Sequence, residues 1–304
     1  MPSKANLATT YVLLIFIWST TPLAIVWSVS DLNAFWALAL RFFLALPLAV
    51  ALLFIFKNKL PMDKLSLQSY LAGSLSFIGS QIFTYMATAY LSSGMIALMF
   101  GLAPIMTGLI GRFFFHVHLH RLQWVGMAVA VTGLSIICLG GSDHHINPIG
   151  IVLMLISVCV YCVSMFWVKK VNAPLQPMSQ ATGSILISAL FSLCMLPFIW
   201  QEMPTQLPST KALIGLFYSV IMASLVAMFC YFKLVQNIKA TTLSLTTVMT
   251  PMLAMLFGAI LNDEKLTVLV VVGAVILLSG LFIYFYKDFK ASRELAQKIS
   301  TSKH

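Results

Sequence analysis

Long apolar stretches alternate with short polar or basic ones from one end of the chain to the other. Each stretch has the length of a membrane-spanning helix, about 20 residues, and lacks the every-second-residue alternation of a barrel strand. Backbone groups inside lipid must be bonded within their own segment, which favours helices. The pattern therefore predicts an all-α polytopic membrane protein with ten transmembrane helices, at Leu7–Trp27, Phe35–Phe56, Tyr70–Tyr90, Ser93–Gly111, Leu122–Gly140, Ile149–Val168, Gly183–Trp200, Ala212–Phe232, Thr242–Leu261 and Leu266–Tyr286.

The chain also repeats itself at a fixed offset. Shifting it by 147 residues aligns Pro251 with Pro104, and likewise Leu266 with Leu119, Gly273 with Gly126 and Gly280 with Gly133. A single amphipathic helix would not produce this register, so we interpret the chain as an internal duplication. Each copy has five helices, an odd number, and the second copy must enter the membrane upside down. We expect two inverted five-helix repeats, residues 1–140 and 149–290, with a hinge at 141–148 and a tail at 291–304.

Composition supports a membrane location. Hydrophobic residues make up 60% of the chain, charged residues 9%, and the mean hydropathy is +0.97, which leaves too little polar surface for a soluble domain. The net charge of +10 would suggest nucleic acid in a soluble protein, but here the basic residues punctuate apolar runs. We therefore expect the lipid bilayer and a small molecule as partners, and no nucleic acid. Oligomeric state is left open between monomer and homodimer.

Charge distribution predicts the orientation. With the N-terminus inside, 15 of the 18 Lys and Arg residues fall on the cytoplasmic side, and five of the eight acids fall outside. This positive-inside bias places both termini in the cytoplasm of an inner-membrane protein. The segment Gly183–Trp200 is the weakest, because it contains Pro197 and several serines. If it did not span, nine helices would remain and the C-terminus would change sides.

Arg41 is the only Lys or Arg deep inside a predicted span. A charge at such depth costs about 2.5–3.5 kcal/mol on insertion scales, so it is expected to face a cavity or a neighbouring helix. The alternative is snorkelling to the external headgroups, because Arg41 lies only about 9 Å of helix rise from Phe35. The spans offer no obvious acidic partner, so carbonyls, waters or an anionic substrate would have to compensate the charge.

Polar and aromatic residues inside the spans suggest a cavity for a small organic molecule rather than a bare metal ion. Mid-helix prolines at matched positions of the two copies, Pro104 and Pro251, indicate a gating or cavity-lining pair. The alternative for each polar residue alone is a hydrogen bond between packed helices. The cavity candidates besides Arg41 are Trp18, Ser19, Thr20, Thr21, Gln81, Thr84, Tyr85, Tyr161, Tyr231, Thr246, Thr247 and Thr250.

Other motifs favour structural roles. The histidines of H-V-H-L-H, residues 116–120, could share a strand face and bind zinc, but we interpret them as a solvated loop. Cys159 and Cys162 form C-x-x-C without a second pair or ligand cluster, so neither a metal nor a cofactor is expected. Glu264 lies at a predicted helix boundary, with a part in transport as the alternative. The paired glycines 126, 133, 273 and 280 predict close helix packing, as scaffold or dimer contacts.

These residues resemble the drug/metabolite transporter superfamily, in particular its ten-helix EamA-like branch. The similar stretches are IWSTTPLAI, LALRFF, SSGMIALMFGLAPIMTGLIG and ATTLSLTTVMTPMLAMLFGAILNDEKLT, and they cover nearly the whole chain in order. The resemblance implies two inverted five-helix bundles around a central cavity, with the last helix of each copy peripheral. It also implies transport of amino acids, metabolites or drugs, frequently outward. Ser19 replaces a usual glycine, and Val117 stands where the family usually has a glutamate like Glu264.

Three functions are compatible with these features. The leading hypothesis is a secondary transporter of small organic solutes that works by alternating access, and it is not an enzyme. The alternatives are a multi-span enzyme acting on lipid-linked substrates through the histidines, or a non-transporting scaffold. Substrate, direction of flux and coupling ion are not determined by the sequence.

Overall fold

The computed structural model describes residues 4–116, 118–140, 147–238 and 246–301. Within these ranges every regular element is helical, and each predicted apolar segment overlaps a helix. The α-helices are α1 Lys4–Ser28, α2 Ala34–Ile55, α3 Lys64–Ser74, α4 Ser80–Ala87, α5 Ser93–Phe100, α6 Ala103–Phe115, α7 Arg121–Gly140, α8 Pro148–Val171, α9 Pro177–Ile199, α10 Thr210–Tyr218, α11 Ala227–Asn237, α13 Thr246–Leu261 and α14 Val268–Thr301.

Two π-helical segments, one 3-10 turn and one break interrupt or end these α-helices. The segment η1, Leu75–Gly79, continues α3 into α4, and η3, Ser219–Val226, continues α10 into α11. The short 3-10 turn η2, Trp200–Glu202, ends α9. Helices α5 and α6 meet at residues 101 and 102, just before Pro104.

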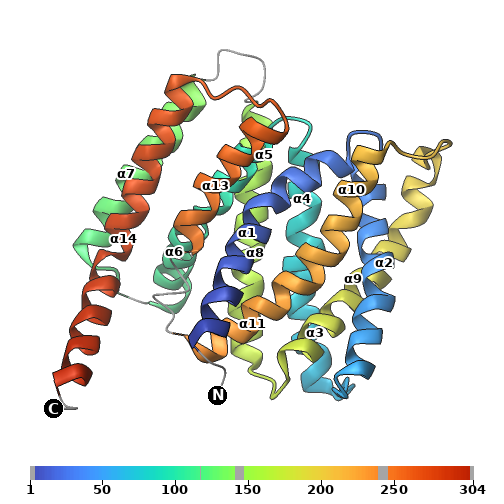
Figure 1. The fold of residues 1–304 in the computed structure, drawn as a ribbon, viewed down its shortest axis with the longest axis horizontal. Coiled ribbons are helices and arrows are strands. Elements are labelled where there is room, and N and C mark those ends of the chain that lie inside the picture. The colour runs from blue at the N-terminus through green and yellow to red at the C-terminus, as the bar shows by residue number, and fades with distance from the viewer. Residues whose placement is uncertain (1–3, 117, 141–146, 239–245, 302–304) are drawn as a thin grey trace.

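Seven helical stretches of the described chain are long and apolar enough to cross a membrane, and two shorter apolar helices accompany them. The stretch 177–202 is one of the seven, although its serines made the corresponding segment the weakest prediction. The fold is therefore that of an all-helical polytopic membrane protein. Ten crossings and their orientation remain a prediction, although the start of α1 and the end of α14 lie at the same end of the bundle (Figure 1).

Local sequence signals explain where several helices begin. The side chains of Asn33, Asp63, Ser92 and Ser209 each accept a hydrogen bond from a backbone N–H in the first turn that follows. Asn147 does the same for α8, where proline occupies the first helical position and needs no N–H partner. Polar residues at the ends of the apolar runs thus satisfy amide groups that would otherwise be left unbonded.

Lipid accounts for the outer surface. Many large apolar side chains are exposed in the middle of helices, among them Val12 at 65%, Val131 at 53% and Phe282 at 53%. In water such a large exposed apolar surface would be unfavourable, whereas in a bilayer it contacts the lipid chains. The buried core lies between the helices, with Tyr70, Tyr85 and Phe42 among its largest fully buried side chains.

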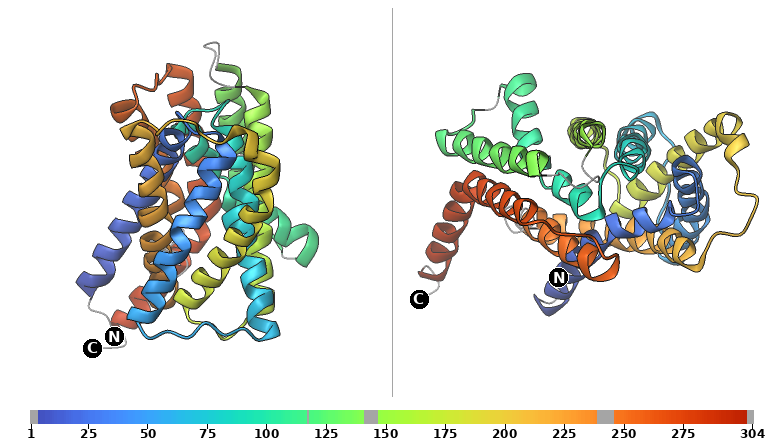
Figure 2. Two further views of the ribbon diagram at one scale, coloured as in Figure 1. Left: turned by 90° about the vertical axis from the view of Figure 1, so that its right-hand side faces the viewer. Right: turned by 90° about the horizontal axis from the view of Figure 1, so that it is seen from above.

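The last helix of each half pairs with its counterpart at one side of the bundle. Helices α7 and α14 run alongside each other at the margin of the bundle (Figures 1 and 2). A Cβ atom built on Gly126 would lie 2.6 Å from the carbonyl oxygen of Gly280, and one on Gly133 would lie 2.6 Å from that of Gly273. Only glycine permits backbones this close. The glycine stripes therefore join the two halves within one chain.

Candidate functional site

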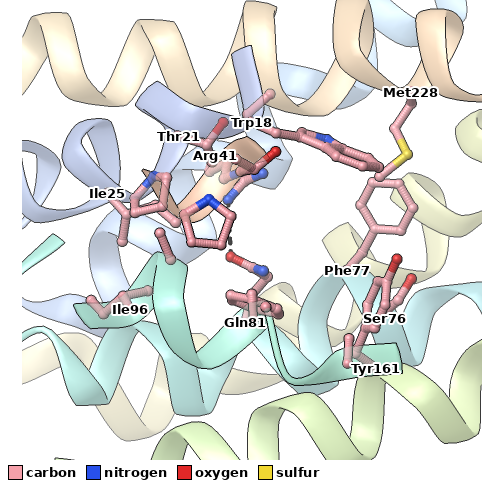
Figure 3. Close-up of a pocket in the computed structure, with 18 residues that line it drawn as sticks. Trp18, Thr21, Ile25, Arg41, Ser76, Phe77, Gln81, Ile96, Tyr161 and Met228 are labelled. Carbon is pink, nitrogen blue, oxygen red and sulfur yellow. Dashed lines mark hydrogen bonds between the residues drawn. The ribbon is translucent and has the colours of Figure 1, made fainter. Parts of the chain in front are cut away.

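A cavity of about 210 Å³ lies in the middle of the bundle and is surrounded by helices from both halves of the chain (Figure 3). Neither member of the peripheral pair α7 and α14 contributes to it. Its described lining is mostly apolar and contains no acidic side chain. The lining residues are Trp18, Thr21, Pro22, Ile25, Arg41, Ser76, Phe77, Gln81, Ile96, Ala97, Phe100, Gly101, Ala103, Tyr161, Ala223, Met228, Thr250 and Pro251.

Arg41 is buried against this cavity, with 5% of its surface exposed. Its Nε donates to Ser224 Oγ at 3.0 Å. Its Nη1 donates to Gln81 Oε1 at 3.3 Å, the contact drawn in Figure 3. Both acceptors are neutral. The guanidinium also lies 5.9 Å from the ring centroid of Phe42. These contacts orient the side chain inward rather than toward a headgroup.

The π-helical segments bring polar groups to the cavity. Shifting η1 by the repeat offset of 147 residues places it on residues 222–226, inside η3. The two halves therefore have a π-helical segment at equivalent positions of equivalent helices. The first segment contributes Ser76 and Phe77 to the lining, and the second contributes Ala223. Ser224, also in η3, accepts from Arg41 and donates to the carbonyl of Ser219 at 2.9 Å. A π-helical turn commonly marks a functional region, because it exposes backbone groups and displaces side chains.

Aromatic rings form much of the remaining wall. Trp18 packs against Tyr231 with 5.4 Å between ring centroids, and Phe100 meets Tyr161 edge to face at 6.2 Å. Phe77 contacts Phe42 behind it in the same edge-to-face manner, at 6.3 Å. Such rings supply large, stiff apolar surfaces against which a ligand can pack.

The two prolines do not have equivalent surroundings. Pro251 is buried within α13 and lines the cavity next to Thr250. Pro104 instead begins α6 after the break, outside the cavity lining. Proline has no N–H and its ring clashes with the preceding turn, so the helix restarts here instead of bending through it. The Oγ1 of Thr250 is buried without a hydrogen-bond partner among the described residues.

The structure brings several of the predicted site residues together: Arg41, Trp18, Thr21, Gln81, Tyr161 and Thr250 line the cavity, with Pro251. Others lie elsewhere. Thr20 bonds to the hydroxyl of Tyr218 and to its own helix, Tyr85 is fully buried, and Tyr231 lies behind Trp18. Ser19, Thr84 and Thr246 are also buried outside the lining. Thr247 is on α13, but its side chain lies outside the described residues.

Sequence reasoning missed Ser224, Phe77, Phe100 and Met228. An apolar residue in an apolar span carries no signal of the direction in which it points. Ser224 was one of many serines in the spans, and the sequence does not reveal that it lies in a π-helical segment and meets Arg41. The repeat offset was the one available clue, because it aligns Gln81 with Met228 and Phe77 with Ser224.

Glu264 acts as a cap for a helix of the first half. Its carboxylate accepts from the backbone N–H of Ser93 at 2.9 Å, from the hydroxyl of Ser93 at 2.7 Å and from the N–H of Gly94 at 3.2 Å. These groups begin α5, where a negative charge is favoured by the helix dipole. The contact joins the loop before α14 to a helix 170 residues earlier in the chain. Val117, at the equivalent position, lies outside the described residues.

The histidines 116, 118 and 120 are all exposed between α6 and α7, as expected for a loop. Within the described ranges no three His, Cys, Asp or Glu side chains are placed to hold a metal ion. Cys159 and Cys162 are free thiols, and Cys162 is buried, where its Sγ accepts from Thr107 Oγ1 at 3.3 Å.

Comparison with known proteins matches both halves of the chain. The model of the EamA-like transporter family fits residues 7–139 and again residues 148–286. The chain is 26% identical over 255 residues to the uncharacterized inner membrane transporter YedA of Escherichia coli strain K12, covering 84% of this chain and 82% of that protein. It is 23% identical to the uncharacterized transporter YdfC of Bacillus subtilis strain 168, covering 74% and 72%.

Two further similarities cover more of the chain. A probable amino-acid metabolite efflux pump of Escherichia coli strain K12 is 22% identical, over 89% of this chain and 92% of that protein. A protein of known crystal structure superposes with a TM-score of 0.66 and 16% sequence identity, over 92% of this chain and 96% of that one. The last likeness concerns the fold alone.

Proposed function

We propose that this chain, which belongs to the EamA-like transporter family, exports small organic solutes by alternating access through the central cavity. It is a membrane transporter of the EamA type and a multi-pass protein of the inner membrane. The names of its relatives indicate transporters, which are not enzymes. The similarity to a probable amino-acid metabolite efflux pump motivates the outward direction and the solute class of amino acids, metabolites or drugs.

The observation that carries the proposal is the cavity itself. It lies between the halves, is lined by aromatic and hydroxyl groups, and holds a buried arginine. A scaffold would need neither the space nor the charge, since an intramembrane charge is costly and is usually kept for function. The exposed histidines lie in a loop at the end of the bundle, which gives the alternative of an enzyme no support.

Contacts between α7 and α14 support the inverted repeat on which alternating access depends. Gly133 approaches the N–H of Leu277, and Gly280 approaches the N–H of Ala130. Leu277 follows Ala130 by the same 147 residues that separate Gly280 from Gly133. Replacing each residue by its counterpart in the other copy thus turns the contact of Gly133 with Leu277 into that of Gly280 with Ala130. This is expected for an antiparallel helix pair whose halves are related by a two-fold axis in the membrane plane.

Thermal stability of the detergent-purified full chain tests the proposal. The panel would contain amino acids, purines, flavins, sugars and cationic drugs, followed by export assays in proteoliposomes for any compound that stabilises. A ligand at 100 times its Kd adds about 2.7 kcal/mol to the free energy of unfolding. We expect at least one compound to stabilise the protein and to be transported.

The matched variants are Arg41→Ala in the cavity and Arg112→Ala on the exposed surface of α6. We expect the first to abolish or redirect transport while the protein still inserts, and the second to behave as wild type. Full activity of Arg41→Ala would remove Arg41 from the mechanism. Absence of transport for every solute that binds would overturn the transporter assignment.

A further inference from the structure

We propose that the cavity selects a small organic monoanion, whose negative group pairs with Arg41 and whose apolar body packs against Trp18, Phe77 and Tyr161. This inference rests on the proposed function, because it names the substrate class of the same site. It is carried by three features of the cavity: an uncompensated positive charge, a lining without acids, and a limited volume.

The charge of Arg41 has no counter-charge in the described lining. A guanidinium offers five N–H donors, and among the described residues only two neutral oxygens, of Ser224 and Gln81, accept from it. Hydrogen bonds to neutral acceptors do not balance a full charge in a low dielectric. The side chain is 5% exposed, so bulk water does not balance it either. A carboxylate that enters the cavity would supply both the charge and paired acceptor oxygens.

The rest of the lining suits an uncharged, apolar remainder. The rings of Trp18, Phe77 and Tyr161 face the space that Arg41 and Gln81 border (Figure 3). At about 210 Å³ the cavity is smaller than the roughly 300–1,000 Å³ typical of sites for drug-sized ligands. The ligand is therefore a small molecule with one anionic end.

The absence of an acid among the lining residues distinguishes a monoanion from a zwitterion. The ammonium group of an amino acid would enter the same cavity without a carboxylate to meet it, at a cost in desolvation. A simple carboxylate brings no second charge. The lining thus favours an organic acid over the amino acid of the same shape.

A monoanionic substrate also supplies a driving force for export. A membrane potential that is negative inside favours outward movement of a negative charge, by about 50-fold in concentration ratio per 100 mV. Such a carrier would need no proton relay, which agrees with the lack of an acidic side chain in the described lining.

The first test compares acids with their amides on the full chain in detergent. The probes are benzoate, phenylacetate and hexanoate, the uncharged amides of the same three acids, and phenylalanine as a zwitterion. We expect at least one carboxylate to stabilise the wild type, and its amide to bind about 10- to 100-fold more weakly, the range for losing a charged hydrogen-bond pair. Equal affinity of acid and amide, tighter binding of phenylalanine, or no binding by any carboxylate would overturn the inference.

Substitutions of Arg41 test whether this residue causes the preference for the carboxylate over its amide. Arg41→Gln should weaken the carboxylate by about 10-fold or more and leave the amide unchanged, while Arg41→Lys keeps part of the preference. Arg112→Gln is the control, with wild-type affinities expected. Unchanged carboxylate binding in a folded Arg41→Gln protein would overturn the inference. If that variant does not fold, the wild-type comparison of acid with amide decides the matter.

Proteoliposomes separate this inference from the proposed function. We expect a carboxylate that binds to be exported faster when the interior is made negative with valinomycin and potassium. Transport of neutral or cationic solutes without any carboxylate would overturn the anion inference and leave the transporter standing. Transport of no solute at all would overturn the proposed function as well.

Discussion

Arg41 is held by acceptors from both halves of the chain, Gln81 on α4 and Ser224 in η3. Each acceptor is itself positioned next to or within a π-helical segment. The orientation of the guanidinium therefore depends on the relative placement of the halves. A conformational change that moves one half against the other would alter these hydrogen bonds.

Ser224→Ala should destabilise the protein and weaken ligand binding together. The substitution leaves the Nε–H of Arg41 without its acceptor in a buried position, which costs about 1–3 kcal/mol. The free energy of unfolding and the Kd of a cavity ligand would be measured on the same preparation. Ser135→Ala is the control, because Ser135 is exposed on α7 and its hydroxyl donates to the carbonyl of Val131 in the same helix. An unaltered Kd in Ser224→Ala would show that the serine does not position Arg41.

At the scale of elements, the two halves are joined by a contact at a helix end and by close packing of two helix backbones. Glu264 ties the loop before α14 to the start of α5, and the glycines tie α7 to α14. Neither contact touches the cavity. Both should therefore govern stability rather than ligand affinity.

Glu264→Gln distinguishes a cap from a proton relay. Glutamine keeps an acceptor oxygen for the N–H groups of Ser93 and Gly94, so a modest loss of stability with retained transport is expected. Glu264→Ala removes every acceptor and should cost about 1–3 kcal/mol in the free energy of unfolding. Unfolding and transport rates would be measured for both. A stable Glu264→Gln protein without transport would instead place this carboxylate in the transport cycle.

Gly133→Val should separate α7 from α14. The added Cβ would lie 2.4 Å from the backbone nitrogen of Leu277, and backbone cannot move aside as a side chain can. Overpacking of this kind costs about 1–3 kcal/mol or more. We expect a lower Tm but an unchanged Kd for cavity ligands in the protein that remains folded. Ala128→Val, on the exposed face of the same helix, should leave Tm close to wild type.

For the whole molecule, the positive-inside pattern predicts both termini in the cytoplasm. The start of α1 and the end of α14 lie at the same end of the bundle, which agrees with the predicted even number of crossings. A fluorescent protein fused to the C-terminus should fold and emit, because it would remain in the cytoplasm, whereas an alkaline phosphatase fusion at the same point should be inactive. The opposite pair of results would contradict the inside orientation of the C-terminus.

Much of the architecture follows from the sequence alone, because its causes are local. An apolar run of sufficient length must be helical in lipid whatever surrounds it, and polar residues such as Asn33 and Asp63 cap the helix beside them. The duplication is visible as a register of prolines and glycines. The depth of Arg41 in its span could likewise be read from the chain, because a lone charge in an apolar run stands out.

Tertiary structure alone decided which polar groups meet. Thr20 and Thr21 are neighbours, yet one bonds to Tyr218 and the other lines the cavity, since successive helical residues point about 100° apart. Glu264 finds its partners 170 residues away, and Ser224 meets Arg41 from within the π-helical segment η3. Such contacts depend on how helices pack, and a hydrophobic pattern along one helix does not specify its neighbours.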